Sequence, residues 1–187
     1  FKTGTTEFTK ETAIATTVSA EDGSFSFEKV PYGTWIVREI ESPKGYVLSE
    51  EEIAVTIGKV DEVVEIELVN YFIKGNIALT KVDEDYPDNK LSGAVFEVYS
   101  DTNGDGKLDN DDTLLGEMKE LDGGVYQMSE LRYGKYLVKE TKAPTGFVLD
   151  EDVYAVSIEE NGKTYTVDES GSVMDGATEV AYVSPYV

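Results

Sequence analysis

One pattern occurs twice in the chain, and this internal repeat constrains the fold more than any other feature of the sequence. Residues 32–48, YGTWIVREIESPKGYVL, align with residues 133–149, YGKYLVKETKAPTGFVL, and eight of these 17 positions are identical. The same shift of 101 residues, from 32 to 133, also places Gly23 on Gly124. The sequence therefore predicts two copies of one domain, at residues 1–72 and 73–187.

Both copies read as short β-strands separated by turns. Runs of four to eight apolar or alternating residues, such as 24–30, 34–40, 63–69 and 76–82, end at Gly-, Pro- or Asn-containing turns. No segment keeps a helical period for three turns, so we predict an all-β fold of two tandem β-sandwiches. Phe1 aligns with Tyr99, so we expect that the first copy lacks its N-terminal strand and that the chain begins inside a domain of a longer protein.

Composition excludes several classes of function. The 187 residues include 38 acidic and 16 basic side chains, and the net charge of −22 argues against nucleic acid or anionic membrane as a partner. There is no Cys and no His, which removes disulfides, thiolate zinc sites and histidine bases. No apolar run approaches 18 residues, so we expect no membrane insertion in this segment.

Four ionisable or amide side chains fall on the apolar face of a predicted strand, where side chains two residues apart point the same way. Glu39 follows Trp35 and Val37, Glu140 follows Tyr136 and Val138, Lys81 follows Ile77 and Leu79, and Asn70 follows Ile66 and Leu68. A buried charge is costly, so such groups must pair or change protonation. The alternative is that each lies at a strand end and reaches water.

The runs GNIALTKVDED, LSGAVFEVYS and the repeated YGxYxVxExxxPxGYxL resemble the Cna-B (SpaA-type, collagen-adhesin B-region) domains of Gram-positive surface proteins and pilins. The resemblance implies an Ig-like or prealbumin-like sandwich in which a lysine and an asparagine or aspartate join through an isopeptide bond, promoted by a glutamate. It assigns the lysine to Lys81, the glutamates to Glu39 and Glu140, and the first copy's asparagine to Asn70.

Such chemistry suits these residue types. Burial can lower a lysine pKa by 3–5 units and so supply the neutral amine, and proximity can contribute roughly 7–11 kcal/mol toward the barrier. On this pattern the first copy's lysine precedes Phe1. In the second copy Ser184, which cannot form the amide, aligns with Asn70, so Asp168, Asp175, a residue beyond Val187, or none, is the acceptor.

Residues 101–112, DTNGDGKLDNDD, carry oxygen ligands at the spacing of an EF-hand or dockerin calcium loop. Gly106 occupies the sharp-turn position, and an aspartate ends the loop where a glutamate is usual. The predicted ligands of Ca²⁺ are Asp101, Asn103, Asp105, Lys107 through its carbonyl, Asp109 and Asp112. The alternative is a solvated acidic hairpin tip.

Together these features predict a stalk, spacer or pilin-like region of a surface adhesin, anchored to the cell wall outside a Gram-positive bacterium. Isopeptide cross-links and calcium would stabilise it, and its partners would be neighbouring domains of the same protein or pilus. The alternative is an adhesive module that binds a host matrix protein or polysaccharide directly. We expect no enzyme activity beyond single-turnover self-cross-linking.

Overall fold

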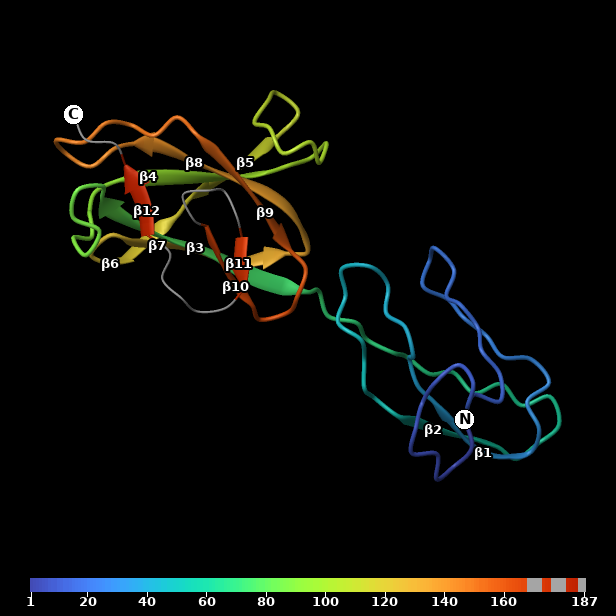
Figure 1. Cartoon of the computed structure of the whole chain (residues 1–187). Coiled ribbons are helices and arrows are strands. Elements are labelled where there is room, and N and C mark those ends of the chain that lie inside the picture. The colour runs from blue at the N-terminus through green and yellow to red at the C-terminus, as the bar shows by residue number, and fades with distance from the viewer. Residues whose placement is uncertain (168–172, 176–180, 185–187) are drawn as a thin grey trace. The chain divides into compact units, whose positions relative to one another are not determined.

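The computed structural model describes residues 1–167, 173–175 and 181–184 of the chain, which divides into two compact units, Phe1–Tyr71 and Phe72–Val187. Every regular element in these described residues is a β-strand, so the predicted all-β class is confirmed (Figure 1). Within the same residues there is no helix with the length and apolar character needed to cross a membrane.

The first unit contains one small sheet. Strand β1 (Gly33–Val37) pairs antiparallel with β2 (Ile53–Ile57), and an isolated bridge joins Lys2 to Trp35. The strands predicted at residues 24–30 and 63–69 are wrong, because neither segment pairs with another strand. A segment forms a β-strand only where a neighbouring strand pairs with its backbone N–H and C=O groups. Alternation of apolar and polar residues does not show whether such a neighbour is present.

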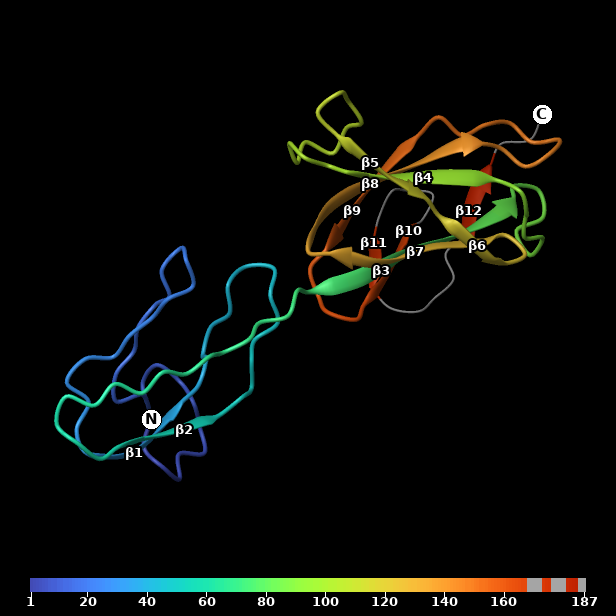
Figure 2. The same cartoon turned by 180° about the vertical axis from the view of Figure 1, so that it is seen from behind.

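The second unit consists of two sheets (Figures 1 and 2). The larger sheet has the order β11–β10–β3–β7–β6, with β12 also pairing with β3, and its strands are β3 (Lys74–Asp83), β6 (Lys119–Asp122), β7 (Val125–Arg132), β10 (Thr164–Val167), β11 (Val173–Asp175) and β12 (Ala181–Ser184). The smaller sheet has the order β5–β4–β8–β9, and its strands are β4 (Val95–Ser100), β5 (Thr113–Glu117), β8 (Gly134–Lys142) and β9 (Val153–Ile158).

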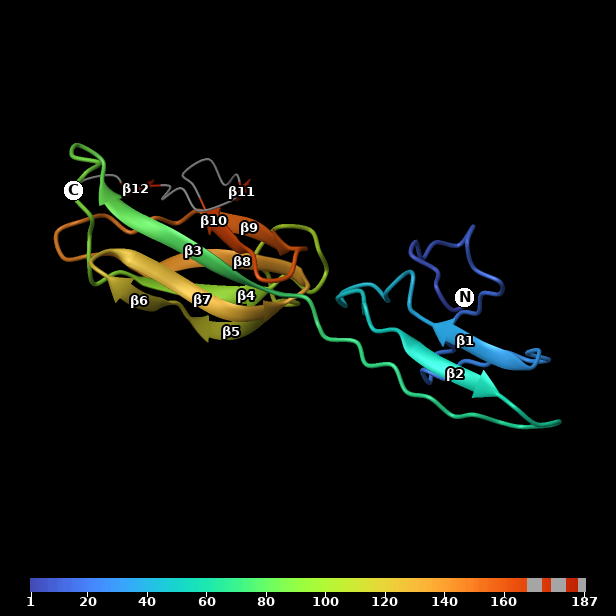
Figure 3. The same cartoon turned by 90° about the horizontal axis from the view of Figure 1, so that it is seen from below.

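Strand β3 is the centre of the larger sheet. It pairs antiparallel with β7 along one edge, and along the other edge it pairs parallel with β10 and then with β12. Figure 3 shows β3 and β7 side by side, with β4 and β8 in the other layer. Strand β3 therefore makes backbone hydrogen bonds on both sides and turns one face to the interior.

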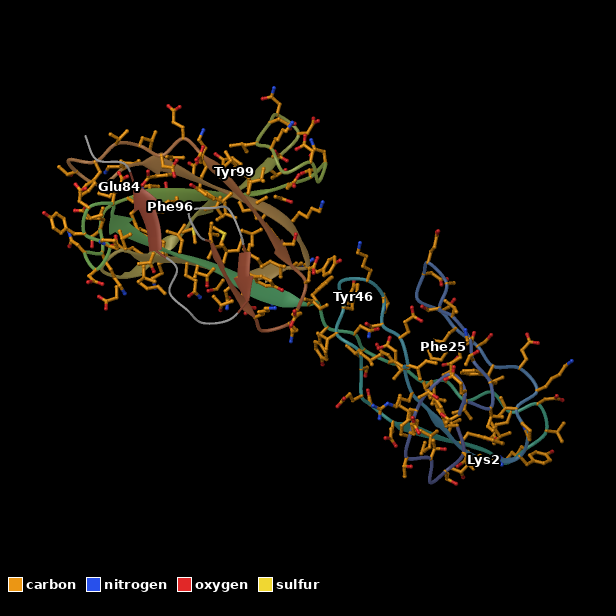
Figure 4. All side chains as sticks on the ribbon, in the orientation of Figure 1. Lys2, Phe25, Tyr46, Glu84, Phe96 and Tyr99 are labelled. Carbon is orange, nitrogen blue, oxygen red and sulfur yellow. The ribbon has the colours of Figure 1, made fainter. Side chains whose placement is uncertain are left out.

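The apolar core of the second unit lies between these two sheets. Phe96, which Figure 4 labels on β4, is 1% exposed and packs edge-on against Tyr126 of β7, with ring centroids 4.9 Å apart. Thirteen further buried residues complete this cluster: Ile77, Leu79, Ala94, Val98, Met118, Leu131, Tyr136, Val138, Tyr154, Val156, Ile158, Tyr165 and Val167. In contrast, no side chain of residues 1–72 is fully buried.

Candidate functional site

Lys81 lies at the buried end of β3, and its side chain is 0% exposed. Its backbone is held from both sides, because its N–H donates to the carbonyl of Gly124 at 2.8 Å and its carbonyl accepts from the N–H of Leu91 at 2.8 Å. Gly124 has a φ of +82°, and a Cβ atom there would lie 2.7 Å from the Leu91 nitrogen and 3.0 Å from the Lys81 oxygen. Only glycine allows the backbone at position 124 to come this close to the backbone of Leu91 and Lys81. This close contact fixes the position of the Lys81 backbone and so the point from which its side chain extends.

The Lys81 amine faces Glu140 of β8, across the interior from the larger sheet. Lys81 Nζ lies 3.0 Å from Glu140 Oε1, and the glutamate side chain is 1% exposed. Burial lowers the pKa of the Lys81 amine from its ordinary value of 10.5, while the hydrogen bond and charge of Glu140 oppose that shift. The site therefore places the Lys81 amine, which is a nucleophile when neutral, in contact with the Glu140 carboxylate, which can accept its proton.

Two residues that the sequence analysis did not single out hold Glu140 in place. The N–H of Asp150 donates to Glu140 Oε2 at 2.8 Å, and Tyr154 Oη donates to Asp150 Oδ2 at 2.9 Å. The negative charge of Asp150 also acts to raise the pKa of Lys81. A backbone N–H donor cannot be recognised from residue identity. The repeat gives one indirect signal of this position, because Asp150 aligns with Ser49 of the first copy.

The first unit contains a related arrangement around Glu39. Asn70 Nδ2 donates to Glu39 Oε2 at 2.7 Å and lies 3.4 Å from the carbonyl of Val47. The N–H of Ser49 donates to the same carboxylate oxygen at 2.8 Å. Both copies thus hold their glutamate through the backbone N–H ten residues further along the chain. The two predicted residues of the first copy are in contact, and both are half-buried.

The predicted site residues therefore form two pairs, one in each unit. Beside Lys81, β12 runs parallel to β3, with Tyr182 opposite Lys81 and Ser184 opposite Asp83. Asp175 lies on β11, opposite Tyr165, and β10 separates that strand from β3. The third predicted acceptor, Asp168, falls outside the described residues.

The predicted calcium loop is a series of turns closed by its own side chains. Asp101, which is 7% exposed, accepts from the N–H of Gly104 at 2.7 Å and of Gly106 at 3.1 Å. The other predicted ligands close shorter turns, with Asn103 Oδ1 accepting the N–H of Asp105, Asp105 Oδ1 that of Lys107, and Asp112 Oδ2 that of Asp109. Across the described part of the chain, no three acidic side chains converge as a metal cage.

Comparison with known proteins identifies the kind of domain. The model of the SpaA prealbumin-like fold domain matches residues 2–71 and again residues 75–171. No curated protein sequence matches the chain.

Among solved structures, the Bacillus anthracis TIE protein is 29% identical over 88% of this chain and 27% of that chain, with a TM-score of 0.69. The minor pilin GBS52 of Streptococcus agalactiae is 24% identical over 90% of this chain and 66% of that chain, with a TM-score of 0.42. The chain thus spans about a quarter of the length of the first structure and about two thirds of the second.

Proposed function

Because the chain belongs to the family of SpaA prealbumin-like fold domains, we propose that it is a structural stalk segment of a Gram-positive cell-surface protein or pilus. Its partners are then the neighbouring domains of the same assembly, outside the cell. The observation that carries the proposal is the buried contact of 3.0 Å between Lys81 Nζ and Glu140 Oε1. A buried ion pair that does not react adds little to the free energy of unfolding. A buried lysine that reacts can instead form a covalent cross-link.

The chemistry we propose is a single-turnover amide bond. The neutral amine of Lys81 attacks the carbonyl carbon of a protonated acceptor carboxyl group, and Glu140 takes the proton that the amine loses. Glu140 then returns the proton to the departing oxygen, so that one water leaves as the carbon–nitrogen bond forms. Because the amine, the glutamate and the acceptor belong to one folded chain, the reaction is intramolecular and needs no cofactor.

For the acceptor we propose Asp168 rather than Asp175. Asp168 directly follows β10, which is a hydrogen-bonded neighbour of β3, whereas Asp175 lies on β11, one strand further from Lys81. The bond then closes a loop of roughly 90 residues and joins the strand that begins the unit to a segment near its end.

Intact mass tests this proposal. A Lys81–Asp168 bond lowers the mass of the chain by about 18 Da, the mass of one water. Lys81→Met, Glu140→Gln and Asp168→Ala should each restore the unmodified mass, and a protease digest should yield one branched peptide that joins the two segments. Exposed Lys74→Met is the matched control on the same strand and should keep the loss. An unmodified mass for the parent chain refutes the cross-link.

We also propose that residues 101–112 bind calcium. The donor set of carboxylate, amide and backbone carbonyl oxygens suits this hard cation. Carboxylates in a chain of net charge −22 repel one another, and a divalent cation would offset that repulsion.

Thermal unfolding tests the calcium proposal. Millimolar calcium should raise the melting temperature of the second unit, as expected for an extracellular site with a dissociation constant of about 10⁻⁴–10⁻³ M. Asp105→Ala should abolish the rise, while Asp88→Ala in a different acidic loop should leave it intact. No rise in the parent chain removes the metal site.

A further inference from the structure

One continuous stretch of chain, residues 113–122, forms an open edge on both sheets of the second unit. Strand β5 lies at the end of the smaller sheet beside β4, and β6 lies at the end of the larger sheet beside β7. Figure 3 shows β5 and β6 along the same side of the unit. Among the described residues, no strand pairs with the outer side of β5 or β6. Their outward backbone N–H and C=O groups can therefore pair with a further strand.

Three leucines on this edge are about half exposed. Leu114, Leu115 and Leu121 have exposed fractions of 52%, 46% and 53%. Leu115 and Leu121 each lie at a β-bulge and have no partner in the register with β4 or β7. Bulges and charged side chains are the usual protection of an edge strand against pairing with another chain. Here the bulges are present, but apolar side chains stand where charges would repel a partner.

Two glutamates lie opposite each other beside these leucines. Glu117 of β5 pairs in register with Glu97 of β4, and like charges directly opposite in a sheet are destabilising. Glu97 accepts the hydroxyl of Tyr99 and has Lys139 of β8 opposite it on its other side. Glu117 is exposed, and within the described part of the chain it forms no ion pair. A strand on the open side of β5 would place a side chain next to this carboxylate.

Leu114 and Glu117 lie on the same face of the smaller sheet. They are opposite Tyr99 and Glu97, which are two residues apart on β4 and so point the same way. Val98, between those two residues, points into the core and is 0% exposed. The face that carries Leu114 and Glu117 is therefore the outer one. A strand beside β5 can contact both with an apolar and a basic side chain on one of its faces.

From these observations we infer that residues 113–122 are a docking edge for an extended segment of another protein, in which apolar side chains alternate with a lysine or arginine. The segment pairs with the open backbone of β5 and β6, covers the leucines and places its basic side chain beside Glu117. Because the bulges limit the backbone pairing to short runs, the leucine and glutamate contacts decide which segment binds. This role is separate from the stalk function, the amide bond and the calcium loop.

Charge argues against a second copy of this chain as the partner. Residues 113–122 carry three acidic side chains and one basic one, and the whole chain has a net charge of −22. Two copies joined along this edge would bring like charges together, which opposes association. A segment with basic side chains gains from the same charges.

Hydrogen exchange of the full chain with synthetic peptides tests the inference. The probe is acetyl-TVTKTVTVT-amide, in which the valines and the lysine share one face of an extended strand. It should slow exchange in residues 113–122 and leave β9, the opposite edge of the smaller sheet, unchanged. Two control peptides have the same length: TVTETVTVT reverses the charge, and TSTKTSTST removes the apolar side chains. Each should need at least about fivefold more peptide for the same protection.

Variants of the chain test the two kinds of contact. Glu117→Lys should weaken binding of the lysine peptide by about fivefold and strengthen binding of the glutamate peptide by a similar factor, because both charge pairs reverse. Leu115→Ser should weaken binding of both peptides without changing the preference between them. Tyr86→Ser is the matched control, since Tyr86 is 70% exposed in a different loop. It should leave affinity and preference unchanged.

Each outcome decides for or against the docking edge. Protection of residues 113–122 by the lysine peptide, with the preference reversed in Glu117→Lys, supports the inference. Absence of protection, equal protection by all three peptides, or an unchanged preference in Glu117→Lys overturns it. Sedimentation velocity of the chain alone should show a monomer. A dimer that Leu115→Ser disperses would assign the edge to a second copy and would also overturn the inference.

Discussion

The double variant Lys81→Met/Glu140→Gln measures what the buried pair contributes. Lys81→Met alone leaves a carboxylate that is 1% exposed without its cation, which costs about 3–5 kcal/mol. Glu140→Gln removes that charge and keeps a carbonyl oxygen for the N–H of Asp150. If Lys81 and Glu140 form only an ion pair, the double variant should therefore be within about 1–2 kcal/mol of the parent.

The amide bond predicts a different result for the same variant. Loss of a cross-link that closes roughly 90 residues removes about 4–5 kcal/mol, which the neutral pair cannot restore. Urea unfolding should be followed by hydrogen exchange in β3 and β8, which lie in the second unit. Tryptophan fluorescence would report on the first unit instead, because the single tryptophan, Trp35, lies there. Exposed Lys74→Met, which breaks a 2.8 Å contact with Glu130, should cost no more than about 1 kcal/mol. A double variant as stable as the parent refutes the reasoning.

Three further predictions follow from the same contacts. Tyr154→Phe should lower the unfolding free energy by about 1–2 kcal/mol in urea and slow amide formation, because it removes the hydrogen bond that holds Asp150 under Glu140; an unchanged rate of mass loss contradicts this role. Burial and Asp150 raise the pKa of Tyr154 above its ordinary value of 10.0, so its contribution is complete below pH 10 and is lost as pH rises further; the alkaline fall in urea stability should be smaller in Tyr154→Phe. Gly124→Ala should destabilise its unit more than Gly23→Ala, which adds only the conformational cost of roughly 1–2 kcal/mol; equal losses in urea unfolding contradict the close approach.

Part of the geometry of the two candidate sites could be predicted from local patterns. Strand alternation placed Lys81 and Glu140 on apolar faces, and both are buried. The repeat and the family resemblance assigned Glu39 and Asn70 to one reaction, and the two side chains are in contact. The burial of Lys81 and Glu140 depends only on residue spacing within a strand, which a single sequence contains, whereas the pairing of Glu39 with Asn70 came from the resemblance.

Other features depend on contacts between distant segments. The parallel pairing of β3 with β10 and β12 joins residues roughly 90 to 100 positions apart and leaves no local signal. The same reason explains why the strands predicted at residues 24–30 and 63–69 are wrong, since alternation within a segment does not show whether a partner strand lies beside it. The N–H of Asp150 that holds Glu140 is a backbone group and is invisible in residue identity.

The parallel contact between β3 and β12 determines how the second unit would respond to tension. The chain enters the unit at the start of β3 and leaves β12 at Ser184, and the two strands run in the same direction. A force that pulls these ends apart draws the strands in opposite senses along their common axis. Their hydrogen bonds are then loaded together rather than opened one after another, so several must break at once before the unit extends.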